Sequence, residues 1–360
     1  MQDKRKILVI MTGGTICSVV DENNENQSDA KRIRSKITNY YINSESPFAD
    51  AAEFDTVFLS DDVLSENITV DVWNELLEVF RDKEIWSKYL GIIVLHGTDT
   101  LAFTSCLLSM VLSGAPIPVC MVSSQLDLSK SATNGYINFK VAVELLFNGI
   151  KPNVYVVYRN MINERDAYDS MGKMYVHLGS QVMQCGSYSH NFYSVGAVEI
   201  KDIDNAKAEG KEFETNLFLL DKIEKITDNV LLLQSYIGQR YSRLNLDGVK
   251  AVLHMTYHSE TVCVERKKEN LKNDNYSERS VLYLIDICRK KGIPFVLTPC
   301  DEKSYTYVSS GDAIRNGALA LYGTTVEAAY VKSLIGCSME NLGNSLIDFL
   351  KKKINFEFAY

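Results

Sequence analysis

The stretch KILVIMTGGTICS, residues 6–18, decides the fold of this chain. Its run of five apolar residues, from Ile7 to Met11, is typical of a strand buried on both faces of a parallel sheet. Gly13 and Gly14 follow at once, and glycine lets the backbone turn tightly or approach a ligand closely. With a threonine on either side, this turn suits a phosphate cradle, an ordinary exit from the strand, or a seat for a nucleophilic hydroxyl group.

Apolar runs of the same kind recur along the chain and alternate with helix-like segments. This order predicts parallel strands joined by helical crossovers, and therefore an α/β sheet. In the first half we expect strands near 56–60, 92–95, 118–123 and 154–158 and helices over 69–84, 100–114 and 132–149. In the second half we expect strands near 230–235, 250–255 and 294–298 and helices over 279–291, 325–336 and 341–352.

The length of 360 residues favours two domains rather than one. A polar, charged segment predicts a linker over 206–228, between an N-terminal α/β domain of residues 1–205 and a smaller C-terminal α/β domain of residues 229–360. The polar residues that follow Cys17 show no helical periodicity, so we expect a long loop there.

Composition excludes several classes of function. The net charge of −8 argues against a nucleic-acid partner, because phosphate binding requires a basic surface. No apolar run approaches the roughly 18 residues that a membrane span needs, and the N-terminus does not resemble a signal peptide. The 8 cysteines are scattered without a Cys-x-x-Cys pair, which argues against a disulfide framework or a zinc site. We expect a cytoplasmic protein with no metal.

Two further segments place polar residues beside strand ends. HGTDT, residues 96–100, follows the expected strand at 92–95, and SEN, residues 65–67, precedes an expected helix. Ligands of open α/β sheets bind at the carboxyl ends of strands. Helix capping accounts for any one of these hydroxyl and carboxylate groups. It does not account for threonine-rich ends on two strands of one sheet.

A nucleotide-binding enzyme is disfavoured by the glycine pattern. A dinucleotide fold requires Gly-x-Gly-x-x-Gly and a phosphate loop requires Gly-Lys-Ser/Thr, and neither follows the first strand.

Taken together, these segments resemble the bacterial-type L-asparaginase family, most closely its cytoplasmic, type I-like branch. TGGTI at 12–16 and HGTDT at 96–100 are similar to the two signatures of that family, and SENITVDVW at 65–73 is similar to its substrate-binding segment. The resemblance continues through PVCMVSSQ, SATNGYIN, VLLLQSYIG, AVLHMTYHSET and YGTTVEAAYVKSLIG. It implies a larger N-terminal and a smaller C-terminal α/β domain.

The resemblance also implies an activity and assigns roles to residues. It implies an amidohydrolase that cleaves the side-chain amide of L-asparagine or of a related small amide. Thr15 would be the nucleophile, while Thr98 and Asp99 would form a polar cluster facing it. Such a reaction needs a nucleophile, a proton acceptor and donors for the oxyanion.

Substrate binding and assembly follow from the same resemblance. Ser65 and Glu66 would hold the amino and carboxylate groups of the substrate beside the turns at Gly14 and Gly97. The family requires no metal or organic cofactor, and its members are homodimers or homotetramers.

The chain departs from the family at two places. Counting back from Phe192 places Gln184 where the family has a lysine, and glutamine cannot relay a proton. The tyrosine expected in the loop after Thr15 is also missing. The candidates that could take over are Tyr40, Tyr41, Lys31, Arg32, Arg34 and His258. These departures leave two alternatives open: a catalytically impaired homologue that binds an amino acid or regulates, and an amidohydrolase with an altered substrate.

Overall fold

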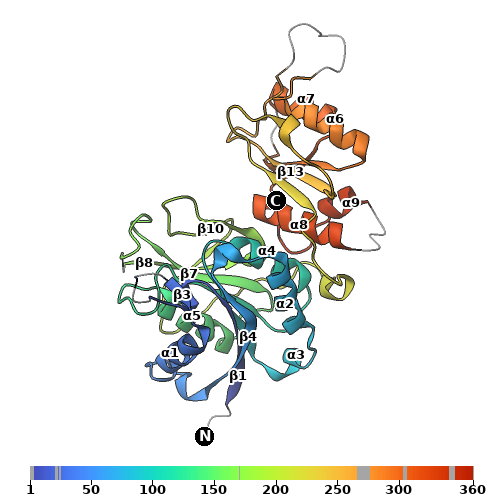
Figure 1. The fold of residues 1–360 in the computed structure, drawn as a ribbon. Helices are drawn as coiled ribbons and strands as arrows, with labels where there is room; N and C mark the ends of the chain where they lie inside the picture. Colours follow the sequence, from blue (N-terminus) through green and yellow to red (C-terminus); the bar gives the residue numbers. More distant parts are fainter. Residues whose placement is uncertain are drawn as a thin grey trace. The chain divides into compact units, whose positions relative to one another are not determined.

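The computed structural model describes residues 4–20, 23, 26–169, 171–265, 276–302, 306–339 and 345–359. It divides into two compact units, Met1–Lys222 with Ile354–Phe356, and Ile223–Lys353 with Glu357–Tyr360. Both are α/β units, as the sequence predicts (Figure 1). In the described part of the chain, no helix is both long and apolar enough to cross a bilayer.

The N-terminal unit is built on a seven-stranded sheet in the order β11-β8-β7-β6-β5-β1-β4. Its central pairs are parallel, while β8 runs antiparallel to both β7 and β11. The strands are β1 (Arg5–Gly13), β4 (Ala52–Val63), β5 (Gly91–Leu95), β6 (Val119–Val122), β7 (Val154–Met161), β8 (Gly172–Leu178) and β11 (Val198–Ile200). All five residues of β5 are buried, as expected for a strand covered on both faces.

Helices cover both faces of this sheet. Alternate residues of β1, namely Ile7, Val9 and Met11, pack into one core with α1 (Ala30–Ile42) and α5 (Gly135–Phe147). The opposite face carries α2 (Val70–Arg81) and α4 (Leu101–Val111), with the short α3 (Ile85–Lys88) beyond them (Figure 1). Helix α4, predicted over 100–114, is buried along nearly its whole length, as its mostly apolar sequence favours.

The segment after Cys17 corrects our expectation of a loop. It contains the antiparallel pair β2 (Ser18–Val20) and β3 (Asn26–Ser28) and helix α1, and it directly follows a short 3-10 helix (Thr15–Cys17). Asp29 caps α1 by accepting a hydrogen bond from the Arg32 N–H group at 3.1 Å. The helix was missed because only four residues spaced by three or four face the core, in a strongly polar surrounding: Ala30, Ile33, Ile37 and Tyr41.

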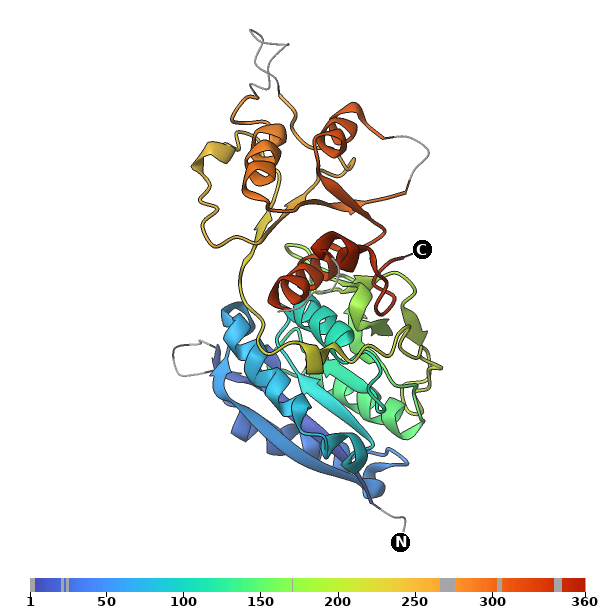
Figure 2. The ribbon, with the colours of Figure 1, turned by 90° about the vertical axis from the view of Figure 1, so that its right-hand side faces the viewer.

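The C-terminal unit repeats the α/β plan on a smaller scale. Its four parallel strands, in spatial order, are β12 (Val230–Leu233), β13 (Ala251–Met255), β14 (Phe295–Cys300) and β15 (Leu319–Tyr322). Helices α6 (Val281–Lys291) and α7 (Val308–Arg315) cover one face. Helices α8 (Val326–Ser338) and α9 (Leu346–Lys351) cover the other (Figure 2). Part of the helix expected over 341–352 lies outside the described residues.

Candidate active site

Two glycines join the end of β1 to its neighbours. Gly13 has a φ of 103° and Gly14 a φ of 79°, values that favour glycine. The Gly14 N–H group donates to the Val63 carbonyl oxygen at 2.9 Å, which ties the end of β1 to the end of β4. A Cβ atom on Gly14 would lie 2.2 Å from the Cα atom of Gly97, so the two turns pack backbone against backbone.

Ser65 connects this pair of turns to Asp99. A Cβ atom on Gly97 would lie 2.4 Å from the Ser65 hydroxyl oxygen. That hydroxyl group donates to Asp99 Oδ2 and accepts from the Asp99 N–H group, both at 3.2 Å. Thr100 Oγ1 donates to the Ser65 carbonyl oxygen at 2.9 Å. The segments that follow β1, β4 and β5 therefore meet at the carboxyl end of the sheet.

The sequence-predicted residues of these segments differ in exposure. Thr15 is half-buried, whereas Ile16 and Cys17, which follow it, are buried in the core and anchor its short helix. Thr98 is half-buried as well, and Asp99 is exposed. Glu66 is exposed beside the buried Ser65. The two threonines and the two acidic residues are thus at least partly exposed to solvent, whereas Ser65 is buried.

Gln184 lies against the same turn. It follows the short strand β9 (Val182–Met183), and its side-chain Nε2 donates to the Thr98 carbonyl oxygen at 2.7 Å. Its Oε1 atom accepts from the Ala102 N–H group, in the first turn of α4, at 3.3 Å. The position that departs from the family pattern is therefore in contact with the Thr98 turn.

A pocket of about 400 Å³ opens beside this turn. Thr98, Asp99 and Gln184 line it, whereas Thr15, Ser65 and Glu66 are not among its lining residues. The remaining lining residues are Gln125, Tyr158, Cys185, Gly186, Ser187, Tyr188, Ser189, His190 and Phe192. The sequence analysis did not single out any of these as a site residue.

Tyr158 belongs to a row of buried polar residues at the carboxyl edge of the sheet. Leu95 pairs with Val122, and Val122 pairs with Val157, so the residues that follow them, His96, Ser123 and Tyr158, lie side by side across three strands. All three are fully buried. His96 Nε2, Ser123 Oγ and the Tyr158 hydroxyl oxygen have no hydrogen-bond partner among the described residues. The signal in the sequence was a polar residue directly after or near the end of each buried apolar run.

Burial keeps this row uncharged at neutral pH. It lowers the pKa of His96 to about 4, and it raises the pKa of the Tyr158 phenol. His96 Nδ1 lies 2.7 Å from the Gly97 carbonyl oxygen, so this nitrogen carries the proton and Nε2 is an acceptor. Neither side chain supplies a charge to the pocket.

The tyrosines considered as substitutes for the missing loop tyrosine have other partners. Tyr41 is buried, and its hydroxyl group is hydrogen-bonded to Ser46 at 2.9 Å and to Glu144 at 3.4 Å. Tyr40 stacks on Tyr136 with ring centroids 4.4 Å apart. Three of the other candidates lie exposed on helix α1: Lys31, Arg32 and Arg34. His258 is exposed in the C-terminal unit. None of these residues is among those that line the pocket beside Thr98.

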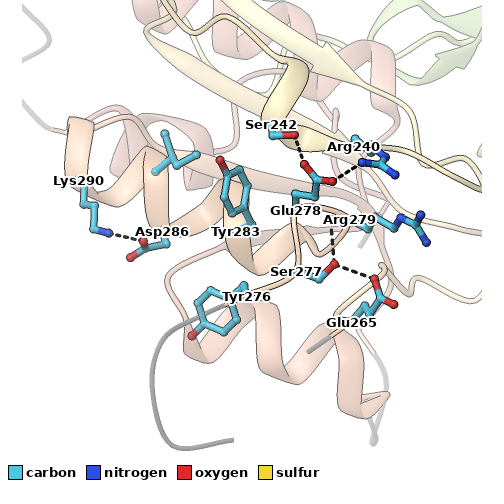
Figure 3. Close-up of a pocket in the computed structure, with 11 residues that line it drawn as sticks. Arg240, Ser242, Glu265, Tyr276, Ser277, Glu278, Arg279, Tyr283, Asp286 and Lys290 are labelled. Carbon is cyan, nitrogen blue, oxygen red and sulfur yellow. Dashed lines mark hydrogen bonds and ion pairs between the residues drawn. The ribbon is translucent and has the colours of Figure 1, made fainter. Parts of the chain in front are cut away.

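A larger pocket, of about 660 Å³, lies in the C-terminal unit (Figure 3). Four of its charged side chains form ion pairs within the pocket. Glu278 forms an ion pair with Arg240, and Lys290 contacts Asp286 at 2.6 Å. The pocket contains none of the sequence-predicted site residues, and we do not assign the activity to it. Across the described ranges, no group of three or more His, Cys, Asp or Glu side chains is placed to hold a metal ion.

Comparisons with known proteins identify the family of the N-terminal part of the chain. Residues 6–212 match the family model "Asparaginase, N-terminal". The chain is 28% identical over 232 residues to a glutamyl-tRNA(Gln) amidotransferase subunit of Sulfurisphaera tokodaii, a match that covers 64% of this chain and 48% of that protein. It is 30% identical over 158 residues to the L-asparaginase of Thermococcus kodakarensis, a match that covers 44% of this chain and 45% of that protein. The chain thus spans about half the length of these curated relatives.

Solved structures show the fold over the whole chain. The thermostable L-asparaginase of Thermococcus kodakarensis superposes with a TM-score of 0.71 at 21% identity, over 98% of this chain and 99% of that one. L-asparaginase I of Vibrio cholerae superposes with a TM-score of 0.65 at 19% identity, over 99% of both chains. Because the family model covers more than half of the chain, including the turns at Gly14, Ser65 and Gly97, the protein belongs to the asparaginase family.

Proposed function

We propose that this protein is an amidohydrolase that cleaves the side-chain amide of L-asparagine or of a related small amide through the Thr15 hydroxyl group. The observation that carries the proposal is the convergence of three strand ends. The Gly14 turn packs on Gly97, and the Ser65 hydroxyl group bonds to Asp99. Two of the matched relatives are named as an L-asparaginase and an amidotransferase subunit, and these names support a reaction at an amide.

In the proposed reaction, the Thr15 oxygen adds to the amide carbon and its proton leaves to a nearby acceptor. The carbon–nitrogen bond then breaks, and the nitrogen departs as ammonia after gaining a proton. Water cleaves the resulting ester, which restores the Thr15 hydroxyl group and releases the carboxylic acid. Thr98 and Asp99 would take the proton from Thr15 and deliver a proton to the departing nitrogen, because the neutral amide of Gln184 is neither a general acid nor a general base.

Oxyanion donors in this proposal come from backbone amides of the turns. The Gly14 and Asp99 N–H groups are already bonded, to the Val63 carbonyl oxygen and the Ser65 hydroxyl oxygen respectively. The donors would therefore be neighbouring amides, with those of Thr15 and Thr98 as the first candidates. Ser65 and Glu66 would hold the substrate's amino and carboxylate groups.

The alternative is a homologue that binds an amino acid without hydrolysing it. Gln184 favours this alternative, because its amide bonds to the Thr98 carbonyl oxygen and to the Ala102 N–H group and does not act as a general acid or base. Loss of general acid–base assistance costs about 10²- to 10⁴-fold in rate. Calorimetry separates the two functions: saturable binding of L-asparagine without ammonia release supports the binding protein.

Ammonia release from the purified chain tests the proposed hydrolysis. We expect release from L-asparagine or another member of a panel of small amides, and a loss of about 10³-fold or more in Thr15→Ala and Thr98→Ala. Thr38→Ala is the matched control, since that hydroxyl group donates to the Arg34 carbonyl oxygen at 2.8 Å within helix α1. Full activity in Thr15→Ala would remove the proposal.

Assembly and location complete the proposal. We infer a homodimer or homotetramer in the cytoplasm. The relatives named as amidotransferase subunits add a second arrangement, in which the chain works as one component of a complex with a different protein. Sedimentation distinguishes these arrangements by mass. It is measured on the purified protein alone and after mixing with an extract of the cells in which the protein naturally occurs.

A further inference from the structure

Gln184 holds the turn that carries Thr98 and Asp99. Its Nε2 donates to the Thr98 carbonyl oxygen at 2.7 Å, and its Oε1 accepts from the Ala102 N–H group at 3.3 Å. The first N–H groups of a helix have no partner within the helix and need an external acceptor. Thr100 lies at the N-cap position of α4 but makes no capping hydrogen bond with its side chain. Gln184 therefore supplies an acceptor that the helix start itself does not.

A lysine at this position could form only one of these two hydrogen bonds. An ammonium group donates hydrogen bonds but accepts none, so it would satisfy the Thr98 carbonyl oxygen and leave the Ala102 N–H group without Oε1. Glutamine satisfies both groups while adding no charge. The clamp is thus neutral, and its side chain also forms part of the pocket wall.

Because Gln184 carries no charge, the charge of the pocket depends on its other lining residues. Among the residues that line it, Asp99 is the one carboxylate, and none is a lysine or an arginine. No ion pair within the described residues involves Asp99. The other lining groups are hydroxyls, amides, aromatic rings, a thiol and the imidazole of His190. Burial raises the pKa of the Cys185 thiol, which keeps that group neutral as well.

A second acidic residue, Glu66, is next in sequence to the residue that bonds Asp99. Glu66 follows Ser65, whose hydroxyl group is bonded to Asp99 at 3.2 Å, and Glu66 is exposed. Among the described residues that line the pocket, Asp99 therefore supplies a negative charge that no lysine or arginine balances. Opposite charge on a ligand is favoured there and like charge is disfavoured.

We propose that the pocket beside Thr98 selects small amides that carry a positive charge and no free carboxylate, with Gln184 as the residue that sets this preference. The ligand class is an amino-acid amide whose α-carboxylate is blocked, as in a carboxamide, ester or peptide linkage. The ligand's ammonium group is placed against Asp99. This inference rests on the proposed function for the choice of an amide, and it concerns binding rather than turnover.

Three probes of equal core and different charge test the preference. They are L-asparaginamide, L-asparagine and N-acetyl-L-asparagine, with net charges of about +1, 0 and −1 at about pH 7, where most of a free α-amine is protonated. Dissociation constants are measured by calorimetry on the Thr15→Ala protein, so that turnover does not interfere. We expect the order of affinity to follow the charge, with about tenfold between the cationic and the anionic probe at low salt and less at high salt.

Variants at position 184 separate charge from clamping. Gln184→Lys is expected to reduce the cation-to-anion affinity ratio about tenfold, because it adds a positive charge beside Asp99. Gln184→Met removes the clamp without adding charge, so it is expected to lower thermal stability and to preserve the ratio. If the cation-to-anion affinity ratio changes equally in both variants, the lost hydrogen bonds and not the added charge cause the change, and the inference is overturned.

The remaining outcomes separate this inference from the proposed hydrolysis. Ordered binding without any ammonia release by the wild-type protein supports the inference and overturns the hydrolysis. Ammonia release combined with an equal or higher affinity for N-acetyl-L-asparagine than for L-asparaginamide overturns the inference and leaves the hydrolysis standing. Failure of all three probes to bind, with no ammonia released, overturns both.

Discussion

His96 and His254 are two buried histidines in comparable places, one in each unit. His96 directly follows β5, and His254 lies near the end of β13. Each uses Nδ1 to contact the carbonyl oxygen of the next residue, at 2.7 Å for His96 and 2.9 Å for His254. Burial lowers the pKa of both to about 4. The two rings therefore share the contact of Nδ1 and the lowered pKa.

The second nitrogen distinguishes them. His254 Nε2 is hydrogen-bonded to the Tyr241 hydroxyl group at 2.7 Å. His96 Nε2 has no partner among the described residues, and neither do the neighbouring Ser123 and Tyr158 hydroxyl groups. A buried polar atom without a partner costs about 1–3 kcal/mol. The C-terminal histidine is fully bonded, whereas the N-terminal unit leaves buried polar groups incomplete where the candidate site lies, as functional sites often do.

The largest expected effect is at the turn that follows His96. In Gly97→Ala the new Cβ atom would lie 2.4 Å from Ser65 Oγ and 2.9 Å from Gly14 Cα, so the turn has to open. We expect a loss of about 3 kcal/mol in the free energy of unfolding, measured with urea. Gly186→Ala is the control, because its Cβ atom would meet nothing within 4 Å. Equal losses in the two variants would show that the turn is not closely packed.

Unfolding at acid pH tests the property that His96 and His254 share, a pKa lowered by burial. Each histidine binds a proton below a pKa of 6.5 in the unfolded chain but only near 4 in the folded protein. The unfolded state therefore binds more protons between these values, and stability falls as the pH falls from 6.5 to 4, by up to about 1.4 kcal/mol per pH unit for each ring. His177, whose pKa burial also lowers to about 4, adds a third contribution.

Urea unfolding between pH 7 and pH 5 measures this slope. We expect His254→Gln to flatten it by removing one of the three titrating rings. An unchanged slope in that variant would mean that His254 does not stay neutral in the folded protein.

Two tyrosine-to-phenylalanine substitutions separate the units directly. Tyr241→Phe removes the partner of His254 Nε2 and is expected to cost about 1–2 kcal/mol. Tyr158→Phe removes a hydroxyl group that has no hydrogen-bond partner in the described part of the chain, so we expect no loss, or a small gain. The side chain of Asn134 lies near that phenol, while its oxygen accepts from the Gln125 N–H group and its nitrogen donates to the Arg159 carbonyl oxygen. Thermal unfolding compares the pair, and a larger loss in Tyr158→Phe would reverse the comparison.

The smallest expected effect is in the pocket of Figure 3. The side chains of Arg240 and Glu278 are 37% and 40% exposed, and an exposed ion pair contributes little in water. We expect Arg240→Met to change the free energy of unfolding by less than about 1 kcal/mol and to leave ammonia release unaltered. A loss of activity in this variant would assign a function to this pocket.

Several elements were predictable because their sequences satisfy one local rule. The apolar runs before Thr12 and before His96 are typical of strands buried on both faces, and the structure confirms both. Helix α4 is apolar over most of its surface and is buried. The asparaginase resemblance, based on segments 12–16, 65–73 and 96–100, is confirmed by the family model and the superposed structures. The roles of Thr15, Thr98 and Asp99 remain predictions.

Other elements depended on partners distant in the sequence. Helix α1 was expected to be a loop, since four core-facing residues among many charged ones give little periodicity until α5 is beside them. Tyr158 drew no attention, because a tyrosine in an apolar strand is ordinary. Only the register of β5, β6 and β7 shows that it lies in a row with His96 and Ser123.

The sequence by itself determined the layered α/β architecture and the family, because strand and helix periodicity and the glycine turns are local properties of the chain. The tertiary structure alone decided the state of the site: that Gln184 clamps the Thr98 turn, that Asp99 is not balanced by a lysine or arginine in its pocket, and that three buried polar atoms lack hydrogen-bond partners among the described residues. Charge balance and hydrogen bonding depend on distances between atoms, and these are set only when separate strands are brought into register.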